Sequence, residues 1–264
     1  MERITSVQNP KIKNYISLVS SSKARRDQGL FVLEGIRLVL DVLRSERTIE
    51  ELYYTEDAYS SFKSDIDSLL IASNNVFIIS DNVAEKMSDT KTPQGVFAVV
   101  SLSGATEEIL EDGKYILLEN VQDPANLGAI SRTAEALGIS GLIVSGGCNI
   151  YSPKALRASM GALLRIPVIE TDDVTKTIEG AKKSGMKTFA STPREDAESV
   201  TESDFSGGVI VVVGNEANGV TCSTMEICDK KITIKMIGRA ESLNAGAAAS
   251  ILMWEMVKPI NDKS

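Results

Sequence analysis

The stretch that most constrains the fold is VIVVV at residues 209–213, a nearly unbroken run of β-branched residues. Such a run is typical of a strand buried on both faces of a parallel sheet. Gly214 follows directly, and its missing Cβ lets the backbone bend or a ligand approach closely. Residues 231–236 predict another strand, and residues 244–256 predict a helix packed through small residues. Strand, glycine turn, polar residue and helix together favour a ligand site at the carboxyl edge of an open α/β sheet.

The same alternation extends back to residue 114. Further strands are predicted at residues 114–121, 141–146, 166–170 and 186–192, and helices at residues 129–138, 152–164 and 173–185. Strands that alternate with helices in every position predict an α/β fold with a parallel sheet.

The first hundred residues predict a smaller α/β unit. Pro10 begins a predicted helix, the polar and basic residues 22–29 predict a loop, and shorter strands and helices follow to residue 102. Residues 103–113 contain Gly and acidic residues with little periodicity. We therefore expect an amino-terminal domain at 1–102, a linker at 103–113 and a second domain at 114–264.

Composition narrows the chemistry. The 264 residues include no histidine, which excludes a Ser-His-Asp triad, a Cys-His pair and a histidine general base. The three cysteines show no CxxC spacing, so we expect no metal site. Their odd number and wide spacing favour reduced thiols and a cytoplasmic location. The apolar runs are too short for a membrane span, and residues 1–15 lack the apolar segment of a secretory signal.

Charge is unevenly distributed along the chain. The net charge is −8, which argues against a surface that coats nucleic acid generally. The first 30 residues nevertheless carry six basic and two acidic side chains, a local excess of +4; the basic ones are Arg3, Lys11, Lys13, Lys23, Arg25 and Arg26. A local RNA-binding patch and an ordinary solvated basic face explain this segment equally well.

Polar residues gather where the strand at 114–121 ends. Asn120, Asp123 and Asn126 lie in the predicted turn, and Arg132 follows in the first turns of the next helix. An arginine and asparagines at this edge are suited to holding a phosphate by charge-assisted hydrogen bonds. Helix capping by Asn126 with a surface arginine is the alternative. No GxGxxG or GxxxxGK[ST] motif follows a predicted strand.

Three separated blocks of the second domain resemble the SpoU (TrmH-type) ribose 2′-O-methyltransferases of the SPOUT class. The blocks are NLGAISRTAEALG at 126–138, VVVGNEANGV at 212–220 and IKMIGRAESLNAGAAASIL at 234–252. RASMGALLRIPV at 157–168 resembles the segment that connects them in that family. The first domain resembles the RNA-binding domain that such enzymes often carry, through SVQNPKIK, FVLEGIRLV and QGVFAVV. The resemblance implies a parallel sheet with a deep trefoil knot, preceded by a small α/β RNA-binding domain.

The resemblance also implies the cofactor and the site. S-adenosylmethionine supplies a methyl group on a sulfonium, so neither metal nor histidine is needed. The cofactor is expected against Gly214, Ile234 and Leu243, largely through backbone contacts. The positions associated with catalysis and substrate placement correspond to five polar residues here: Asn126, Arg132, Glu216, Ser242 and Asn244.

Two questions about these polar residues remain open at this point. Arg132 corresponds to a residue proposed as the base, yet a guanidinium is effectively always protonated, so gripping phosphate and stabilising an alkoxide suit it better. Glu216 is then either the rival proton acceptor or a group that orients its neighbours. Ser242 and Asn244 are both candidates for capping the last helix instead.

The resemblance implies a homodimeric RNA ribose 2′-O-methyltransferase whose sites lie near the dimer interface. The amino-terminal domain favours large-subunit (23S) rRNA as the substrate. The alternatives are a tRNA ribose 2′-O-methyltransferase and a non-enzymatic RNA-binding or ribosome-assembly factor on the same fold. The chain departs from the family pattern at Lys235, where proline is common, and at Ala217, where glycine is more usual. Neither position carries an essential functional group, so an altered loop shape is expected.

Overall fold

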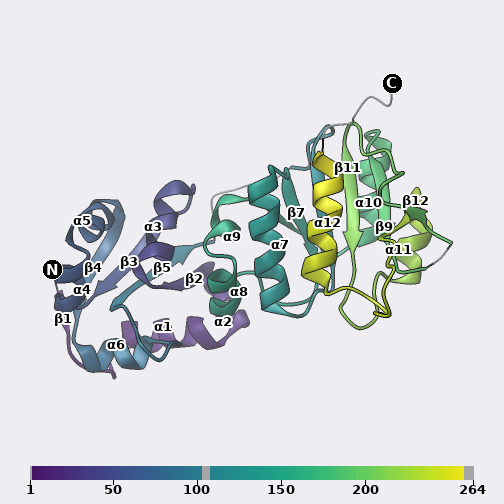
Figure 1. Cartoon of the computed structure of the whole chain (residues 1–264). Coiled ribbons are helices and arrows are strands. Elements are labelled where there is room, and N and C mark those ends of the chain that lie inside the picture. The colour runs from purple at the N-terminus through teal and green to yellow at the C-terminus, as the bar shows by residue number, and fades with distance from the viewer. Residues whose placement is uncertain (1, 103–107, 195, 259–264) are drawn as a thin grey trace. The chain divides into compact units, whose positions relative to one another are not determined.

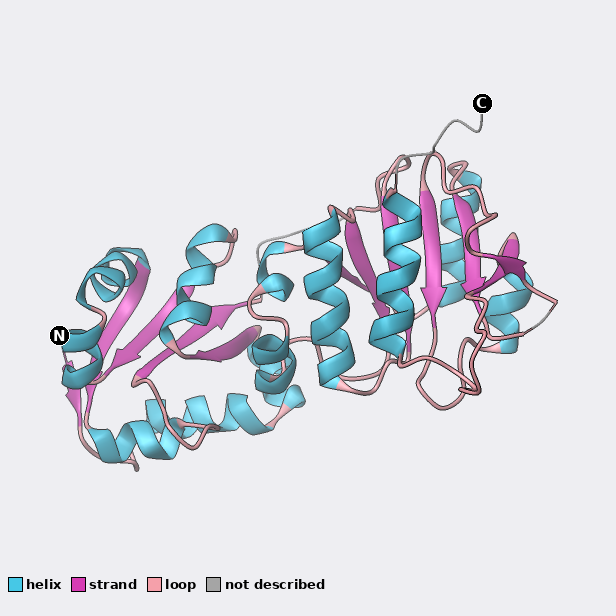
Figure 2. Cartoon of the chain, viewed as in Figure 1, coloured by secondary structure: helices cyan, strands magenta, loops and turns pink. Residues whose placement is uncertain are grey.

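The computed structural model describes residues 2–102, 108–194 and 196–258. The chain divides into two compact units, one built from residues 1–106 with 150–165 and the other from residues 107–149 with 166–264. Figure 1 follows the chain through both units, and Figure 2 separates their helices from their strands. Each unit is described by itself.

The first unit is built on a five-stranded mixed sheet in the order β1-β4-β3-β5-β2. Its strands are β1 (Glu2–Ile4), β2 (Leu30–Glu34), β3 (Ile49–Tyr54), β4 (Ser73–Ile79) and β5 (Val96–Ser101). Its helices up to residue 102 are α1 (Pro10–Ser20), α2 (Ser22–Gln28), α3 (Ile36–Leu40), the 3-10 helix η1 (Asp41–Arg44), α4 (Glu56–Ser61), α5 (Lys63–Ala72) and α6 (Asp81–Met87). Strand β5 runs antiparallel to both of its neighbours, which sets this unit apart from a purely parallel sheet.

Aromatic side chains form the centre of the first unit. The Tyr15 ring meets the rings of Tyr53 and Phe97 edge to face, and Tyr53 stacks on Phe77 with ring centroids 5.2 Å apart. All four side chains are buried. Because aromatic side chains bury the largest apolar areas, they provide much of the hydrophobic stabilisation of this unit.

The predicted loop at residues 22–29 is wrong, because α2 occupies most of it. Ser21 caps the helix by accepting a hydrogen bond from Ala24 N, and Gly29 ends it in the left-handed conformation. The Arg25 guanidinium is buried and donates to the carbonyl oxygens of Leu18 and Val19. It thereby satisfies carbonyl groups at the end of α1, a tertiary role that a basic, polar sequence does not reveal.

Two helices from the middle of the chain belong to the first unit. They are α8 (Pro153–Ala158) and α9 (Ala162–Arg165). The Arg157 guanidinium lies 2.7 Å from Asp89, and Arg165 lies 2.8 Å from Asp41. The compact unit therefore includes a segment that follows residue 114, whereas the predicted domains are continuous in sequence. The assignment of roles to the domains stays a prediction.

The second unit contains a seven-stranded sheet in which all pairs are parallel, in the order β10-β12-β9-β11-β6-β7-β8. The strands are β6 (Lys114–Glu119), β7 (Gly141–Ser145), β8 (Val168–Glu170), β9 (Lys187–Ser191), β10 (Glu198–Ser199), β11 (Val209–Val213) and β12 (Lys230–Thr233). The helices are α7 (Pro124–Leu137), α10 (Val174–Lys183), α11 (Cys222–Ile227) and α12 (Ala245–Val257). Figure 1 shows α7 and α12 on one face of the sheet and α10 and α11 on the other.

The sequence of β11 accounts for its place inside this sheet. All five of its residues are buried, and it pairs with β6 on one side and β9 on the other. Since helices cover both faces, every position of the strand must be apolar, as the run at 209–213 predicts. The predicted α/β fold with a parallel sheet is confirmed, and the trefoil knot stays a prediction of the family resemblance.

Three remaining expectations concern the linker, the end of β12 and a membrane span. The predicted linker at 103–113 falls partly on residues 103–107, which lie outside the described residues. Strand β12 ends at Thr233, three residues before the predicted end at 236. None of the helices in the described ranges combines the length and the apolar character that crossing a bilayer requires.

Candidate active site

The candidate site lies where the strand order of the parallel sheet reverses. From β6 the chain proceeds outward to β7 and β8 and then returns to β9 on the other side. In open α/β sheets, ligands bind at such a reversal, beyond the carboxyl ends of the strands. A pocket of about 370 Å³ opens there, lined by segments that follow β9, β11 and β12 and by the start of α12.

Three polar side chains form a hydrogen-bonded chain beside this pocket. The Asn126 amide donates to Glu216 Oε1 at 2.8 Å, and the Asn244 amide donates to Asn126 Oδ1 at 2.8 Å. Asn126 is 5% exposed, so its amide cannot bond to water instead. Loss of either of its two hydrogen bonds would leave a buried polar group unpaired, which is destabilising. The structure thus brings together three of the five polar residues predicted from sequence.

Glu216 joins the loop after β11 to the loop after β6. Its carboxylate also accepts from the backbone N–H groups of Gln122 and Asp123, both at 3.1 Å. Burial acts to raise the pKa of Glu216, but the hydrogen bonds from Asn126 and the two backbone groups outweigh it and lower the pKa from 4.5. At neutral pH this side chain is therefore an anion held by three donors, which makes it a weak proton acceptor.

One further contact holds the same loops together, and a glycine closes one of them. Asn120 adopts a left-handed backbone with φ of 57°, a conformation that asparagine tolerates better than most residues. Its carbonyl oxygen accepts from the Asn215 amide at 3.0 Å. A Cβ on Gly214 would lie 2.1 Å from backbone atoms of Gly219 and Val220. The loop therefore closes on itself so tightly that only glycine fits at residue 214.

The three residues predicted to bind the cofactor all line the pocket. These are Gly214, Ile234 and Leu243, and Ser242 lines it as well. Backbone polar groups at a glycine turn, beside apolar side chains, suit an adenosine and an extended aliphatic chain. The prediction from sequence did not include Thr192 and Pro193 after β9 or Met236 after β12, which also line it. Their only signal was a position at, or just past, the end of a predicted strand.

Asn244 has two functions at once. Its side-chain oxygen accepts from Gly246 N and Ala247 N, so it caps α12, while its amide nitrogen reaches Asn126. Asn244, and not Ser242, is therefore the residue that caps this helix. The two interpretations left open for Asn244 are compatible, because an amide offers an acceptor and a donor.

Arg132 lies apart from this chain of hydrogen bonds. It is exposed on α7, and among the described residues it makes no hydrogen bond or ion pair. Six residues separate it from Asn126, which places the two about 120° apart around the helix axis. Within one chain, Arg132 is thus not brought to the other predicted polar residues.

The basic side chains of the first 30 residues are only partly free. Arg25 is buried against α1, Arg3 pairs with Glu56, and Lys11 pairs with Glu51 at 3.0 Å. The remaining basic side chains in this segment are exposed; they are Lys13, Lys23 and Arg26. The patch available to an anionic partner is smaller than the sequence predicts.

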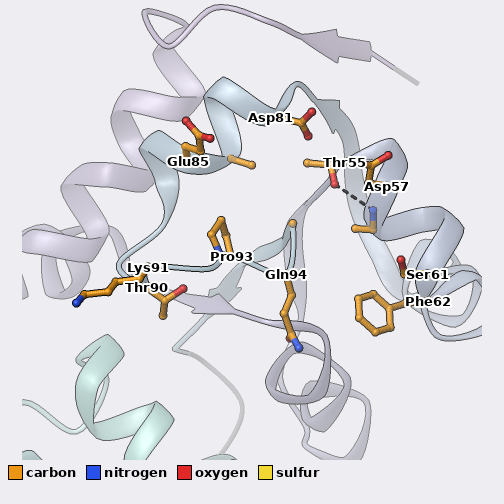
Figure 3. Close-up of a pocket in the computed structure, with 13 residues that line it drawn as sticks. Thr55, Asp57, Ser61, Phe62, Asp81, Glu85, Thr90, Lys91, Pro93 and Gln94 are labelled. Atoms are coloured by element: carbon orange, nitrogen blue, oxygen red, sulfur yellow. Dashed lines mark hydrogen bonds between the residues drawn. The ribbon is translucent and has the colours of Figure 1, made fainter.

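A larger hollow of about 540 Å³ lies in the first unit and is shown in Figure 3. Thr55, at its wall, accepts from Ala58 N at 3.1 Å. Its charged lining consists of Asp57, Asp81 and Glu85 against one cation, Lys91. This excess of carboxylates disfavours phosphates and other anions. The hollow also lacks every predicted site residue, so the pocket of the second unit is the candidate active site.

No cluster of three or more potential metal ligands occurs among residues 2–102, 108–194 and 196–258. The polar groups of the candidate site are amides, hydroxyls and one carboxylate. The arrangement is suited to holding an organic ligand and a hydroxyl nucleophile.

Two family models match the chain in the same order as the two predicted domains. A model of an MRM3-like substrate binding domain matches residues 9–98. The model of the SpoU rRNA Methylase family matches residues 113–254, more than half of the chain.

Known proteins resemble the chain over almost its whole length. The 23S rRNA (guanosine(2553)-2′-O)-methyltransferase RlmP of Bacillus subtilis is 28% identical, covering 97% of this chain and 99% of that protein. The 23S rRNA (uridine(2479)-2′-O)-methyltransferase of Streptomyces viridochromogenes is 27% identical, covering 97% and 92%.

A solved structure shares the fold. The SpoU methyltransferase AviRb from Streptomyces viridochromogenes, in complex with the cofactor AdoMet, has a TM-score of 0.83 and 26% identity, covering 95% of this chain and 97% of that chain. The matched family model, the parallel sheet and the site at its reversal agree, and the chain belongs to the SpoU rRNA Methylase family.

Proposed function

We propose that the protein is an S-adenosylmethionine-dependent ribose 2′-O-methyltransferase that acts on 23S rRNA. The observation that carries this proposal is the glycine-walled pocket with the hydrogen-bonded chain of Asn126, Glu216 and Asn244 at its side. Two relatives that match nearly the full length are named 23S rRNA 2′-O-methyltransferases, which supports the substrate.

The pocket residues fit the cofactor. Gly214 lets the loop that forms the pocket wall close on itself, while Ile234 and Leu243 provide apolar contact for an adenosine. Leu243 is 37% exposed in the described chain, so its side chain is accessible to a ligand. When bound, S-adenosylmethionine supplies an electrophilic methyl group.

The polar residues have distinct roles in this proposal. Glu216, whose pKa is lowered, holds the loops after β6 and β11 in register and does not take the proton of the ribose hydroxyl. Asn126 and Asn244 orient the nucleophile through hydrogen-bonding positions of their amides that the chain of hydrogen bonds does not use. Ser242 lines the pocket and offers a hydroxyl to the ribose. Arg132 stabilises the negative charge that develops on the ribose oxygen.

The site geometry supports a homodimer in which Arg132 acts on the partner's site. Apart from this arginine, the outer face of α7 carries small side chains: Ala125, Ala129 and Ala136 are exposed at helical spacing. On the neighbouring helix α12, Ile251 and Trp254 are 39% and 58% exposed. Thr133 and Ser250 join the two helices by a hydroxyl contact of 3.1 Å.

We call the exposed apolar residues of these two helices the α7–α12 face; they are Ala125, Ala129, Ala136, Ile251 and Trp254. An apolar face rich in small residues lets helices of two chains approach closely, and covering Trp254 contributes hydrophobic stabilisation. A second copy seated there brings its own Arg132 to the interface. The homodimer thus explains why an exposed arginine matches a catalytic position.

The amino-terminal unit provides the RNA contacts in this proposal. Three of its exposed cations, Lys13, Lys23 and Arg26, lie on α1 and α2, where no described carboxylate pairs with them. Substituting them with alanine is expected to weaken RNA binding and to reduce its dependence on salt, because each cation displaces condensed counterions.

The test of the proposed function is methyl transfer from S-adenosylmethionine with a labelled methyl group. Undermethylated 23S rRNA and tRNA are offered separately, and nuclease digestion locates the label. Label on a ribose 2′-oxygen of rRNA supports the proposal. Label on tRNA alone keeps the chemistry and overturns the substrate. No transfer, together with no cofactor binding by calorimetry, favours a ribosome-assembly factor.

Mixed dimers test the placement of Arg132. Arg132→Ala and Asn244→Ala chains are each expected to be nearly inactive alone. Mixed in equal amounts, they recover roughly a quarter of wild-type activity, because half the dimers are mixed and each has one intact site. No recovery, with exchange of chains verified, shows that Arg132 acts within its own chain.

A further inference from the structure

Glu119 is a buried carboxylate that the proposed chemistry does not use. It is the last residue of β6 and is 5% exposed. A buried carboxylate is strongly destabilising unless donors surround it. Three donors do so: Thr221 N at 2.8 Å, Thr221 Oγ1 at 2.8 Å and Thr224 Oγ1 at 2.6 Å.

These donors all belong to the segment that follows the glycine loop. Thr221 caps α11, whose residue Met225 lines the pocket. The residue before the cap, Val220, lines it as well. Glu119 itself does not line the pocket, so its influence on a bound ligand must pass through Thr221 and α11.

The loop between Gly214 and Val220 is closed by hydrogen bonds between its own backbone groups. Gly219 N donates to Asn215 O at 2.8 Å, and Asn215 N donates back to Gly219 O at 3.2 Å. Glu216 fastens the tip of this loop to the segment after β6. Glu119, the last residue of β6, accepts a hydrogen bond from Thr221 N and so fastens the end of the loop to that strand. The position of the pocket wall therefore depends on two carboxylates, one at the tip of the loop and one beside its end.

We propose that Glu119 is a positioning residue for cofactor binding, which sets the place of the 214–220 loop by anchoring Thr221 and Thr224. This inference rests on the proposed function, since it concerns the same pocket. It assigns Glu119 a role in cofactor affinity and none in contacts with the RNA.

Three substitutions test the hydrogen bonds between Glu119 and the two threonines. In Glu119→Gln an amide replaces one carboxylate oxygen, so an N–H group faces either the Thr221 N–H or the two hydroxyls. In the first case the Thr221 N–H loses its acceptor, and in the second the two hydroxyls must rotate to act as acceptors, so the variant disturbs the set of donors in either orientation. Glu119→Asp keeps the charge on a shorter side chain. Thr224→Val removes one donor without changing the size of the side chain much.

Glu34 in the first unit offers a matched control. Its carboxylate accepts from Ser88 Oγ and Thr90 Oγ1, both at 2.6 Å, and from Asp89 N at 3.0 Å. Its side chain is 7% exposed. Glu34 does not line the cofactor pocket, so Glu34→Gln disturbs a similar set of donors without touching the pocket wall.

The experiment measures S-adenosylmethionine affinity by calorimetry, the KM values for cofactor and RNA, and thermal unfolding of the same proteins. Glu119→Gln is expected to raise the cofactor Kd and KM about tenfold, which corresponds to about 1.4 kcal/mol. The KM for RNA is expected to stay within about twofold. Glu119→Asp restores part of the affinity, Thr224→Val loses about threefold, and Glu34→Gln leaves the cofactor Kd unchanged.

Two results would overturn the inference while leaving the proposed function in place. In one, the wild-type protein binds the cofactor and Glu119→Gln binds it equally well despite a lower Tm. In the other, Glu119→Gln and Glu34→Gln weaken binding equally. If Glu119→Gln does not fold, unchanged affinity in Thr224→Val decides against it. No binding by the wild-type protein overturns the proposed function, and this inference with it.

Discussion

Individual side chains in the site meet structural and functional demands together. Asn244 caps α12 through its oxygen and reaches Asn126 through its nitrogen. Glu216 holds two loops and is part of the same chain. Substitutions here are expected to affect stability as well as activity, so each needs a measurement that separates the two.

Glu216→Gln is expected to lower kcat/KM about tenfold, equivalent to about 1.4 kcal/mol of transition-state stabilisation. The NH2 group that replaces one carboxylate oxygen cannot accept from the backbone N–H group that faces it, which weakens the link between the loops after β6 and β11. Steady-state kinetics with labelled cofactor measures this. Glu179→Gln, an exposed substitution on α10 that does not line the pocket, is the control. Unchanged kinetics in Glu216→Gln contradicts the role assigned to the carboxylate.

Glu216 also predicts a pH dependence of stability. Its folded pKa is lower than in the unfolded chain, so the carboxylate contributes stability above the unfolded value of about 4.3 and loses it as pH falls through the folded pKa. The difference in unfolding free energy between wild type and Glu216→Gln should therefore be constant from pH 7 to 5 and shrink below pH 4. Urea unfolding over that range measures it. A difference that grows on acidification contradicts the sign.

Among the secondary-structure elements, buried strands were the most predictable from sequence. The apolar run at 209–213 requires two covered faces, and β11 has them. Helix α2 was missed because its buried side chain is the charged Arg25, which binds carbonyl groups at the end of α1. No apolar periodicity therefore marks this helix in the sequence. Thr192 and Met236 were missed for a similar reason, since folding alone places them at the pocket.

The polar site residues were named by resemblance and not by spacing. Nothing in the sequence pattern alone places Asn126 beside Glu216, because they are 90 residues apart. Arg132 was grouped with them, yet its place on the exposed face of α7 becomes clear only from the structure. Residue types were thus predictable, whereas their mutual geometry depended on the order of the strands.

The 214–220 loop gives a prediction at the scale of an element. Gly214→Ala places a Cβ 2.1 Å from the backbone of Gly219 and Val220, which cannot move aside as a flexible side chain does. We expect cofactor binding to fall by at least about tenfold, since the loop must open. Calorimetry measures the loss.

Gly180 provides the matched control for that substitution. It lies within α10, and a Cβ there meets nothing within 4 Å. Gly180→Ala is expected to stabilise the protein by about 0.5–1 kcal/mol and to leave cofactor binding unchanged. Equal loss of binding in both variants would refute the steric explanation for Gly214.

The whole molecule is expected to work as a dimer through the α7–α12 face. Trp254→Glu places a charge on that face and should convert the proposed dimer to monomers, and activity should be lost at the same time. Sedimentation equilibrium measures the mass. Ile71→Glu, at a side chain 90% exposed on the first unit, is the control and should remain dimeric. A Trp254→Glu protein that is still dimeric and active contradicts the proposed interface.

The wide spacing of the site residues has a consequence for how the enzyme is made. Asn126 meets Glu216 across 90 residues and Asn244 across 118 residues of chain. A chain emerging from the ribosome can form β6, β7 and much of the sheet before these partners exist. Because Asn244 is also the cap of α12, docking of that helix completes the site. Partly synthesised chains therefore cannot sequester the cofactor, and activity begins only when the final helix is in place.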